Sequence, residues 1–466
     1  MRPHNYPNYF KAYLAVVALL FVGHASAANW YVRPSSAGTN TGADWNNAWS
    51  LSTVNWGSIR AGDTLWLAGG QYSSGLTTGA SGSAGSPILI YRAQATDSVP
   101  ASAAGWSSSF DSTITLGGID VPSGSYVTIS GRVQGGIVIK VTAAGGDCVT
   151  GAEVGSISNI SFYNISCVGP YTSGNVGGGG AHGFNIAPSN NKVSNVLIHA
   201  CSVVGMGESL RASNWSNVTV EYCYLADTNT NSAEHEDVLY SYPSTNVVFR
   251  YNVINNSPND GVFFEYGGAT NFSFYGNIYY NSEGWFICTK AASGSVYGPI
   301  YIYNNVFMSP STGGAWVSTN SASMTGTSYV YNNIFYNVSN DVSGSGVTSD
   351  YNAYNYTTLG GYSWNSNEAH SFTFTGNPFV SIPANPQPVG ALVAPWGTAG
   401  DFHLTAAAQA KFQSGIALAN DGFLNKDVQG NTRGTGGFWY IGAYQNGSSQ
   451  PAPSPQTVTG LRISGS

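Results

Sequence analysis

NVTVEYCYL (217–225) and NVVFRYNVI (246–254) are two copies of the nine-residue pattern that decides the fold of this chain. Apolar and polar side chains alternate along each copy, as they do along a half-buried β-strand, and a small polar residue ends the alternation. We call this residue the anchor. The other copies are NVLIHACSV (195–203), NFSFYGNIY (271–279), PIYIYNNVF (299–307) and SYVYNNIFYN (328–337). The anchors of the series are Cys201, Cys223, Asn252, Asn277, Asn305 and Asn333.

The spacing of the anchors predicts a solenoid. Successive anchors are 22, 29, 25, 28 and 28 residues apart, and an earlier copy, ISFYNISCV (160–168), offers Asn164. Leucine-rich repeats would show a leucine signature and propeller blades need about 40 residues, so neither class fits. A parallel β-helix fits, because its corners accept loops of different length and its stacked Asn side chains hydrogen-bond along the axis. We therefore predict an all-β parallel β-helix with an Asn/Cys ladder.

The cysteines allow two arrangements on this ladder. Neighbouring ladder positions lie about 4.8 Å apart, which is within the Cα range of a disulfide. The pattern therefore leaves open whether Cys201 and Cys223 are bridged. The chain has 5 cysteines, and an odd number excludes a fully paired disulfide framework.

Three segments outside the repeats carry a resemblance to a known family. AGDTLWLAGGQY (61–72), GSPILIYRA (85–93) and DFHLTAAAQA (401–410) look like the opening, the first coil and the closing segment of the right-handed parallel β-helix proteins grouped around pectate-lyase-like enzymes. The resemblance covers most of the chain. It implies a right-handed helix divided into a capping segment (28–80), the β-helix (81–380), a closing segment (381–447) and a Pro/Ser-rich tail (448–466).

The first residues predict a secretory signal peptide over residues 1–27. Arg2 and Lys11 provide basic charge, residues 13–22 are apolar but too short to span a bilayer, and residues 25–27 (ASA) form a small-residue cleavage site. No other segment predicts a membrane span. We expect an exported monomer, extracellular or periplasmic.

The remaining composition excludes several partners and cofactors. Removing Arg2 and Lys11 leaves 13 basic against 22 acidic residues, a net charge of about −9, which argues against nucleic acid or an anionic membrane. No Walker loop, zinc-type Cys/His pairing or nucleophile elbow is present, so no organic cofactor is expected. The expected partner is a polysaccharide or another glycan.

A row of acids precedes the anchors. The segments ESLRASN (208–214), EDVLYSY (236–242), DGVFFEY (260–266) and EGWFICT (283–289) each open with acidic residues. Equivalent positions on successive coils stack about 4.8 Å apart, so the acids would line one face. Like charges at this spacing need a cation, and calcium prefers carboxylate oxygens. The predicted calcium ligands are Glu208, Asp237, Asp260 and Glu283.

Two reactions suit such a row. In the lyases of this fold, the resemblance implies, calcium binds a uronate carboxylate and makes the neighbouring C–H more acidic for a basic side chain. In a hydrolase, two carboxylates flank the bond, and the coil spacing alone does not choose between these reactions. The candidate catalytic residues are Asp237, Asp260, His235, Arg211 and Lys290. The candidate substrate contacts are Tyr240, Tyr242, Glu265, Trp285 and His182.

Structural roles stay open for the same residues. Acids before a strand often cap a turn, and aromatic side chains often fill a solenoid. The chain also departs from the family, because VLYSY (238–242) and VFFEYGG (262–268) stand where alginate and chondroitin lyases carry a Lys and an Arg-His-Gly type motif. We predict a carbohydrate-active protein that cleaves a polysaccharide as a lyase or a glycoside hydrolase. The alternative is a non-catalytic glycan-binding or adhesion protein.

Overall fold

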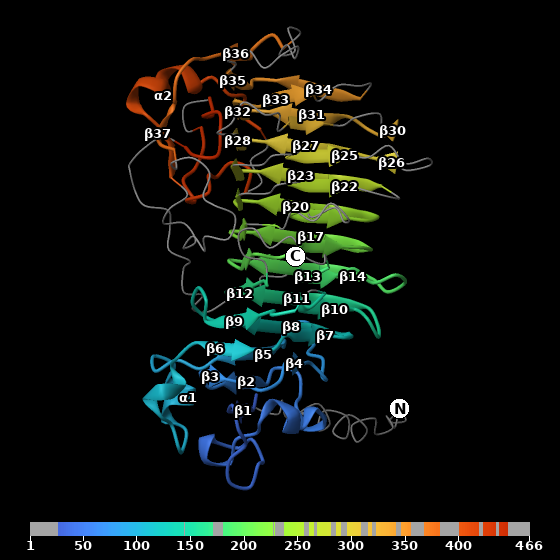
Figure 1. The fold of residues 1–466 in the computed structure, drawn as a ribbon, viewed down its shortest axis with the longest axis vertical. Coiled ribbons are helices and arrows are strands. Elements are labelled where there is room, and N and C mark those ends of the chain that lie inside the picture. Colours follow the sequence, from blue (N-terminus) through green and yellow to red (C-terminus); the bar gives the residue numbers. More distant parts are fainter. Residues whose placement is uncertain are drawn as a thin grey trace, which may run out of the picture.

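The computed structural model consists of three long sheets that wind around one vertical axis in Figure 1. Each central coil contributes one strand to each sheet, and neighbouring strands within the three sheets are parallel. The predicted right-handed parallel β-helix is confirmed. The structure describes residues 27–143, 145–170, 180–226, 228, 237–255, 261–264, 268–280, 286–289, 296–308, 316–318, 323–341, 346–355, 368–382, 400–418, 423–434 and 438–445.

The strands of the three sheets follow one another in chain order. Sheet A consists of β1 (Asn29–Val32), β2 (Thr64–Leu67), β5 (Ile88–Arg92), β8 (Gly124–Ser130), β11 (Ile157–Tyr163), β14 (Val193–His199), β17 (Trp215–Glu221), β20 (Ser244–Arg250), β23 (Ala269–Tyr275), β27 (Ile300–Tyr303), β31 (Ser328–Tyr331) and β34 (Val347–Asp350). Sheet B consists of β3 (Gly70–Gln71), β6 (Ile114–Leu116), β9 (Ile137–Lys140), β12 (Ile165–Val168), β15 (Ser202–Val204), β18 (Tyr224–Ala226), β21 (Val253–Asn255), β24 (Ile278–Tyr280), β28 (Val306–Met308), β32 (Ile334–Tyr336), β35 (Ala353–Asn355) and β36 (Phe372–Thr373). Sheet C consists of β4 (Leu76–Thr77), β7 (Ile119–Val121), β10 (Asp147–Gly151), β13 (His182–Ile186), β16 (Glu208–Ala212), β19 (Leu239–Ser241), β22 (Val262–Phe264), β25 (Ile287–Thr289), β29 (Trp316–Ser318) and β33 (Ser339–Asp341).

The remaining elements lie outside the three sheets. Two small sheets pair β26 (Val296–Tyr297) with β30 (Ser323–Met324), and β37 (Phe379–Ser381) with β38 (Asp401–Leu404). The described residues also contain the α-helices α1 (Ser98–Ser102) and α2 (Ala406–Phe412) and the short 3-10 helices η1 (Trp45–Asn47), η2 (Leu51–Thr53), η3 (Trp56–Ser58) and η4 (Ser108–Phe110). Among the described residues, neither they nor any other helical segment is long and apolar enough to cross a membrane.

An exposed asparagine with a left-handed backbone lies in each long strand of the central coils of sheet A. The φ angles of Asn195, Asn217, Asn246 and Asn271 are 52°, 57°, 55° and 56°, a region that Asn enters more readily than most residues because its short side chain bonds locally. The side chains form an outer row in which the Asn246 amide donates to Asn217 at 2.9 Å and the Asn271 amide to Asn246 at 2.6 Å. The asparagine that opens these four repeats is therefore a bend that recurs on the central coils.

The anchors form a second, buried row where sheet A turns into sheet B. The backbone N–H and the Nδ2 of Asn252 both donate to Oδ1 of Asn277, at 2.9 and 3.1 Å. The same pair of bonds links Asn277 to Asn305, Asn305 to Asn333 and Asn333 to Asn352. Each Nδ2 also donates to a backbone carbonyl, as Asn277 does to Phe249 at 2.8 Å. The buried amides are thus satisfied coil by coil.

The cysteines continue the same position toward the N-terminus without a disulfide. Cys201 and Cys223 are both free and buried. The backbone N–H of Cys223 donates to Oδ1 of Asn252 at 2.9 Å, and its thiol lies 3.3 Å from the carbonyl of Glu221. A thiol fills the anchor position as a small apolar group, so the amide row begins at Asn252.

The last amide of the row meets a buried carboxylate. The backbone N–H of Asn352 donates to the Ser371 hydroxyl at 2.7 Å, and its Nδ2 lies 3.3 Å from Oε2 of Glu368. Glu368, only 3% exposed, also accepts from the hydroxyls of Tyr354 and Ser371. All donors of the row point toward this end, so a negative charge there is favourable, as it is at the N-terminus of a helix.

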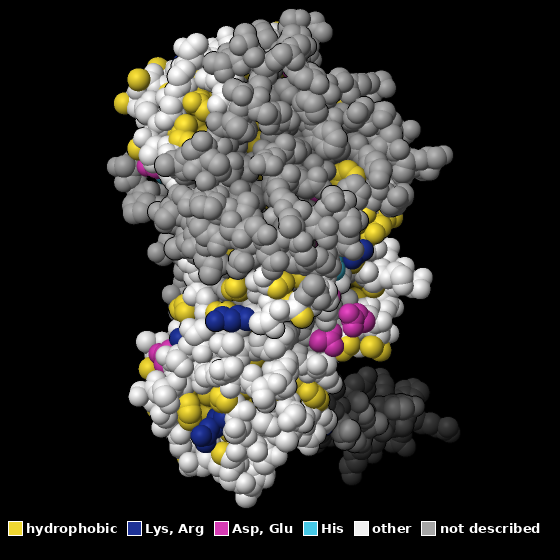
Figure 2. Space-filling model, in the orientation of Figure 1, with side chains coloured by type: hydrophobic (Ala, Val, Ile, Leu, Met, Phe, Trp, Pro, Cys, Tyr) yellow, Lys and Arg dark blue, Asp and Glu magenta, His cyan; other side chains and the backbone are white. Residues whose placement is uncertain are grey.

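The residues after position 400 cover the outward face of sheet B. There Ile278, Val306 and Ile334 pack against the closing segment, including Phe402 and Ile441. Figure 1 shows this orange and red part of the chain, with α2, beside the upper coils. Figure 2 shows few charged groups on the described surface of this view, in line with the 8% of charged residues in the chain.

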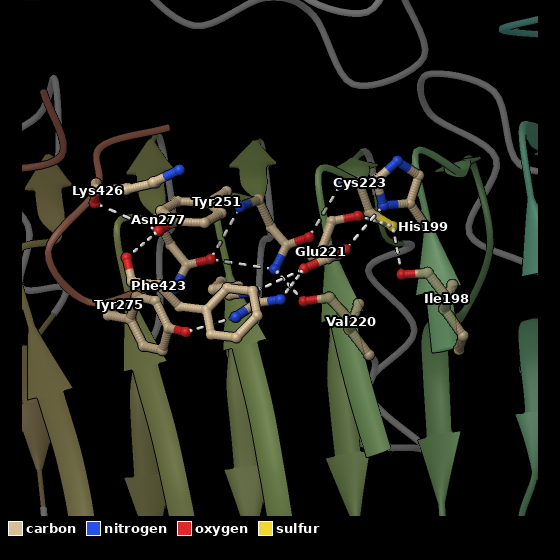
Figure 3. A network of polar contacts seen from close by, with 12 residues as sticks. Ile198, His199, Val220, Glu221, Cys223, Tyr251, Tyr275, Asn277, Phe423 and Lys426 are labelled. Atoms are coloured by element: carbon tan, nitrogen blue, oxygen red, sulfur yellow. Dashed lines mark hydrogen bonds and ion pairs between the residues drawn. The ribbon is translucent and has the colours of Figure 1, made fainter. Parts of the chain in front are cut away.

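A closed ionic network fastens the closing segment to sheet A (Figure 3). Glu221 accepts from Nδ1 of His199 at 2.8 Å and from Nε of Arg250 at 2.6 Å. The ring of Phe423 lies 3.9 Å from the Arg250 guanidinium, and the Tyr251 hydroxyl donates to the Phe423 carbonyl at 2.6 Å. Burial raises the pKa of Glu221, but His199 and Arg250 lower it more, so the net shift is downward.

Removal of one ladder amide should destabilise the helix strongly. Asn305→Ala leaves the buried N–H and Nδ2 of Asn277 without their acceptor, for an expected loss of about 3 kcal/mol in the free energy of unfolding. Urea unfolding followed by circular dichroism measures this loss. Asn246→Gly is the matched control, because it removes an exposed Asn and keeps the left-handed backbone. Equal effects of the two variants would contradict the role of the buried row.

The ionic network around Glu221 should make the free energy of unfolding depend on pH. The lowered pKa of Glu221 stabilises the fold above the ordinary carboxyl value of 4.5, and this contribution disappears as pH falls through the lowered value. Glu221→Gln should therefore unfold more easily than the native chain near pH 7, and this difference should shrink at an acid pH below the lowered pKa. Urea midpoints at both pH values test this. The exposed Glu153→Gln variant should change little, and a Glu221→Gln deficit that is the same at both pH values would refute the linkage.

Candidate functional site

The two predicted acids that the structure describes, Glu208 and Asp237, stand in one row on sheet C. The register pairs Asp147 with His182 and His182 with Glu208 on β10, β13 and β16. Because Leu210 pairs with Leu239, Asp237 occupies the position next to Glu208 on the following coil. One row along the axis therefore contains Asp147, His182, Glu208 and Asp237.

A second row runs beside the first, three residues later in each strand. Asn185 pairs with Arg211, Arg211 with Tyr240 and Tyr240 with Phe263. The rings of Tyr240 and Phe263 stack with centroids 5.9 Å apart, and Tyr242 meets Tyr240 edge-on at 5.0 Å. These residues belong to the outward face of sheet C, so the face is polar on β13 and β16 and aromatic on β19 and β22.

His182 connects the two rows. Its Nδ1 lies 2.6 Å from Oδ1 of Asp147, whose other oxygen accepts from the Asn185 amide at 2.9 Å. Its Nε2 lies 3.3 Å from Nη1 of Arg211 and 3.6 Å from Oε2 of Glu208. The imidazole is 5% exposed, so these groups surround it almost completely.

Arg211 is the cation that this arrangement leaves accessible. Its side chain is 31% exposed. Nη2 donates to the Tyr242 hydroxyl at 3.4 Å, and the guanidinium carbon lies 5.9 Å from the ring centres of both Tyr240 and Tyr242. Burial lowers the pKa of Arg211, but Glu208 and Tyr242 raise it more, so the group stays charged.

The two described acids of the predicted row are deeply buried. Glu208 is 4% exposed and Asp237 is 0% exposed. Nε of Arg211 lies 3.8 Å from Oε2 of Glu208, so a guanidinium already stands where a cation was expected. In the described part of the chain no group of three or more His, Cys, Asp and Glu could hold a metal ion. The guanidinium of Arg211 thus occupies the cation position beside Glu208, and calcium binding by the row stays a prediction because Asp260 and Glu283 lie outside the described residues.

Six of the predicted site residues lie outside the described residues: His235, Asp260, Lys290, Glu265, Trp285 and Glu283. The structure brings together five of the other six, His182, Glu208, Arg211, Tyr240 and Tyr242, on sheet C. The sixth, Asp237, is fully buried at the position next to Glu208 in the register. Their catalytic and substrate-binding roles stay predictions.

Sequence reasoning missed Asp147 and Asn185. Asp147 opens DCVTG (147–151), a strand one coil before His182, just as Glu208 opens the strand one coil after it. Alignment of this earlier copy would have added a fifth polar residue to the row. Asn185 was inside an aligned segment, but only the contact with Asp147 shows its role.

The acidic part of this face extends toward the N-terminus. Asp120 accepts from the Thr150 hydroxyl at 3.0 Å, and Thr150 pairs with Asn185 across β10 and β13. Burial and the charges of Asp120 and Asp147 raise the pKa of Glu153. Figure 2 shows acidic side chains at the height where Figure 1 labels β7 and β10, and a histidine and a basic side chain above them. Acidic and basic groups are thus neighbours along the axis.

The comparisons with known proteins rest on structure. No protein-family model matches the chain, and a search of the curated proteins gives no match. A solved structure of pectate lyase Pel9A is 15% identical over 91% of this chain and 98% of that chain, with a TM-score of 0.54. XylC in complex with xylose is 9% identical over 90% of this chain and 98% of its own, with a TM-score of 0.47.

A third similar structure is a mannuronic acid specific polysaccharide family 6 lyase from human gut microbiota, 11% identical over 75% of this chain and 83% of that one, with a TM-score of 0.45. At these identities a likeness concerns the fold and not the chemistry. Together with the parallel sheets, the likeness to Pel9A identifies the chain as a right-handed parallel β-helix protein.

Proposed function

We propose that this protein binds and cleaves an acidic polysaccharide on the outward face of sheet C by β-elimination. The observation that carries the proposal is the position of Arg211 relative to its carboxylate. Arg92, Arg132 and Arg250 each hold a carboxylate oxygen at 2.6, 2.7 and 2.5 Å, with side chains 8%, 11% and 11% exposed. Arg211 and Glu208 are 3.8 Å apart, and Arg211 is 31% exposed.

This difference separates a structural ion pair from a binding group. A guanidinium has five N–H donors in a planar fork, which match the two oxygens of a carboxylate. His182 and Tyr242 accept from two of these donors on Arg211. The accessible part of the fork can receive the carboxylate of a uronate residue, and Tyr240 and Tyr242 offer rings beside it.

The proposed reaction uses Arg211 and a neighbouring hydroxyl. Arg211 binds the uronate carboxylate and stabilises the negative charge that develops when the adjacent C–H proton leaves. Tyr242, whose oxygen lies 3.4 Å from Nη2 of Arg211, is the candidate base that takes this proton. The electron pair of the C–H bond forms a carbon–carbon double bond, and the glycosidic oxygen leaves with a proton from an acid or from water.

Hydrolysis is the second candidate function. The register places Glu208 and Asp237 on neighbouring coils, a spacing compatible with a pair of hydrolytic carboxylates. Both are almost fully buried, which disfavours direct contact with a glycosidic bond. Calcium binding by Asp237, Asp260 and Glu283 stays a prediction, and the proposed reaction does not require it. Export directed by residues 1–27 is a separate prediction.

The reaction is tested with purified protein and a panel of uronate and neutral polysaccharides. β-Elimination should give the ultraviolet absorbance of a new double bond together with reducing ends, whereas hydrolysis gives reducing ends alone. Binding without either signal would support the glycan-binding alternative. Loss of activity with a chelator would indicate that a metal ion held by the acid row, and not Arg211, binds the uronate carboxylate.

Two substitutions test the assigned roles. Arg211→Leu should lower kcat/KM by about 100-fold or more, because it removes the group that binds the developing charge. Tyr242→Phe should lower kcat by about 100-fold, because it removes the proposed base and keeps the ring. The controls are Lys140→Gln on sheet B and Tyr329→Phe on sheet A, which should retain native activity. Native activity in Arg211→Leu would rule the mechanism out.

A further inference from the structure

Arg211 is held by a chain of hydrogen bonds that begins two coils earlier. The Asn185 amide donates to Oδ2 of Asp147 at 2.9 Å, and Oδ1 of Asp147 faces Nδ1 of His182 at 2.6 Å. Nε2 of His182 faces Nη1 of Arg211 at 3.3 Å, and Nη2 of Arg211 faces the Tyr242 hydroxyl at 3.4 Å. The chain thus runs from β10 through β13 to β16 and on to the residue that follows β19.

The partners of His182 determine which ring nitrogen carries the proton. A guanidinium only donates hydrogen bonds, so Nε2 next to Nη1 of Arg211 must be the acceptor. A carboxylate only accepts, so Nδ1 next to Asp147 must carry the hydrogen. Both contacts are satisfied by one state of the ring, a neutral imidazole protonated at Nδ1. Oε2 of Glu208 also faces Nε2, but at 3.6 Å it is farther away than Nη1 of Arg211 and beyond ordinary hydrogen-bond distance.

This state makes His182 an acceptor for an arginine. A flipped tautomer would point an N–H at Nη1 of Arg211, where two donors would face each other. Asp147 prevents the flip because its carboxylate accepts from Nδ1, and Asn185 fixes that carboxylate through its second oxygen. Burial of the imidazole at 5% exposure keeps water from replacing these contacts.

We propose that Asp147 and His182 are positioning residues that fix the guanidinium of Arg211 for an acidic substrate. His182 holds Nη1 from the side of β13 and Tyr242 holds Nη2 from the opposite side, so rotation of the fork about its own axis is restricted. The donors that remain accessible then keep one direction before substrate binds, which lowers the cost of ordering them. This role rests on the proposed function of Arg211, but the state of His182 is measurable without any substrate.

The first experiment reads the tautomer of His182 directly. Protein labelled with ¹⁵N-histidine is studied near neutral pH by long-range ¹H–¹⁵N correlation spectra, and the His182 signals are assigned by their loss in His182→Gln. The native chain should show the form protonated at Nδ1. Asp147→Leu should shift the population toward the form protonated at Nε2, and Thr150→Val, on the same face but outside the chain of contacts, should leave it unchanged. A native ring that is protonated at Nε2 or at both nitrogens would overturn the inference.

The second experiment measures the effect on Arg211. A Gln side chain at position 182 can still place an amide oxygen near the position of Nε2, whereas Leu cannot accept a hydrogen bond. For an acidic polysaccharide substrate, His182→Leu should raise KM and lower kcat/KM by about tenfold. His182→Gln should recover most of this loss, and melting temperatures identify variants that do not fold.

The outcomes separate this inference from the proposed function. If the native protein neither binds nor cleaves acidic polysaccharides, the proposed function fails and the tautomer still decides whether Asp147 and His182 hold Arg211. If the native protein is active but His182→Gln is as impaired as His182→Leu, an acceptor at Nε2 is not what Arg211 needs. The positioning role is then wrong, while the function of Arg211 stands.

Discussion

The fold depends on satisfying the polar groups that each coil buries where sheet A turns into sheet B. The backbone N–H of every Asn anchor from Asn252 onward points into the interior, and Oδ1 of the next anchor accepts it. An asparagine suits this position because one side chain accepts from one neighbour and donates to the other. The row therefore has a direction, and it must end on an acceptor. Glu368 and Ser371 supply that acceptor at Asn352.

The fixed register of the coils creates the geometry of the candidate site. The strand register alone places His182 next to Asp147 and Glu208, so its side-chain contacts are not needed to bring these residues together. The core is filled by inward side chains such as Phe184 and Leu210, and the amide row lies at another corner. Outward residues of sheet C can thus change with little effect on the coil. This separation is why the fold alone does not specify the chemistry.

The sequence was sufficient to predict the β-helix and the positions of Glu208 and Asp237 on sheet C, but not the side-chain contacts of the candidate site. Period and alternation suffice for the coils because each repeat obeys the same steric rule, and Glu208 and Asp237 follow from strand register. Which atoms meet was not predictable, because side-chain direction depends on neighbours that are far apart in the chain. Asp147 and His182 are 35 residues apart, across a coil whose length the anchors do not determine. Deep burial of Glu208 and Asp237 was missed for the same reason.

The two ionic networks of the molecule show how a charge-poor chain can use similar groups in opposite ways. Around Glu221 the charges contact one another closely, and Phe423 covers Arg250, so the network acts as a fastener. Around Arg211 the closest contacts involve a neutral imidazole and a phenol, while the carboxylate stands farther away. Partial neutralisation keeps a guanidinium attractive to an external anion, whereas a tight pair cancels its field. Burial and the charges of Asp120 and Asp147 raise the pKa of Glu153, so the acidic part of the face lies beside the accessible guanidinium of Arg211 and is the less favourable place for an anionic ligand.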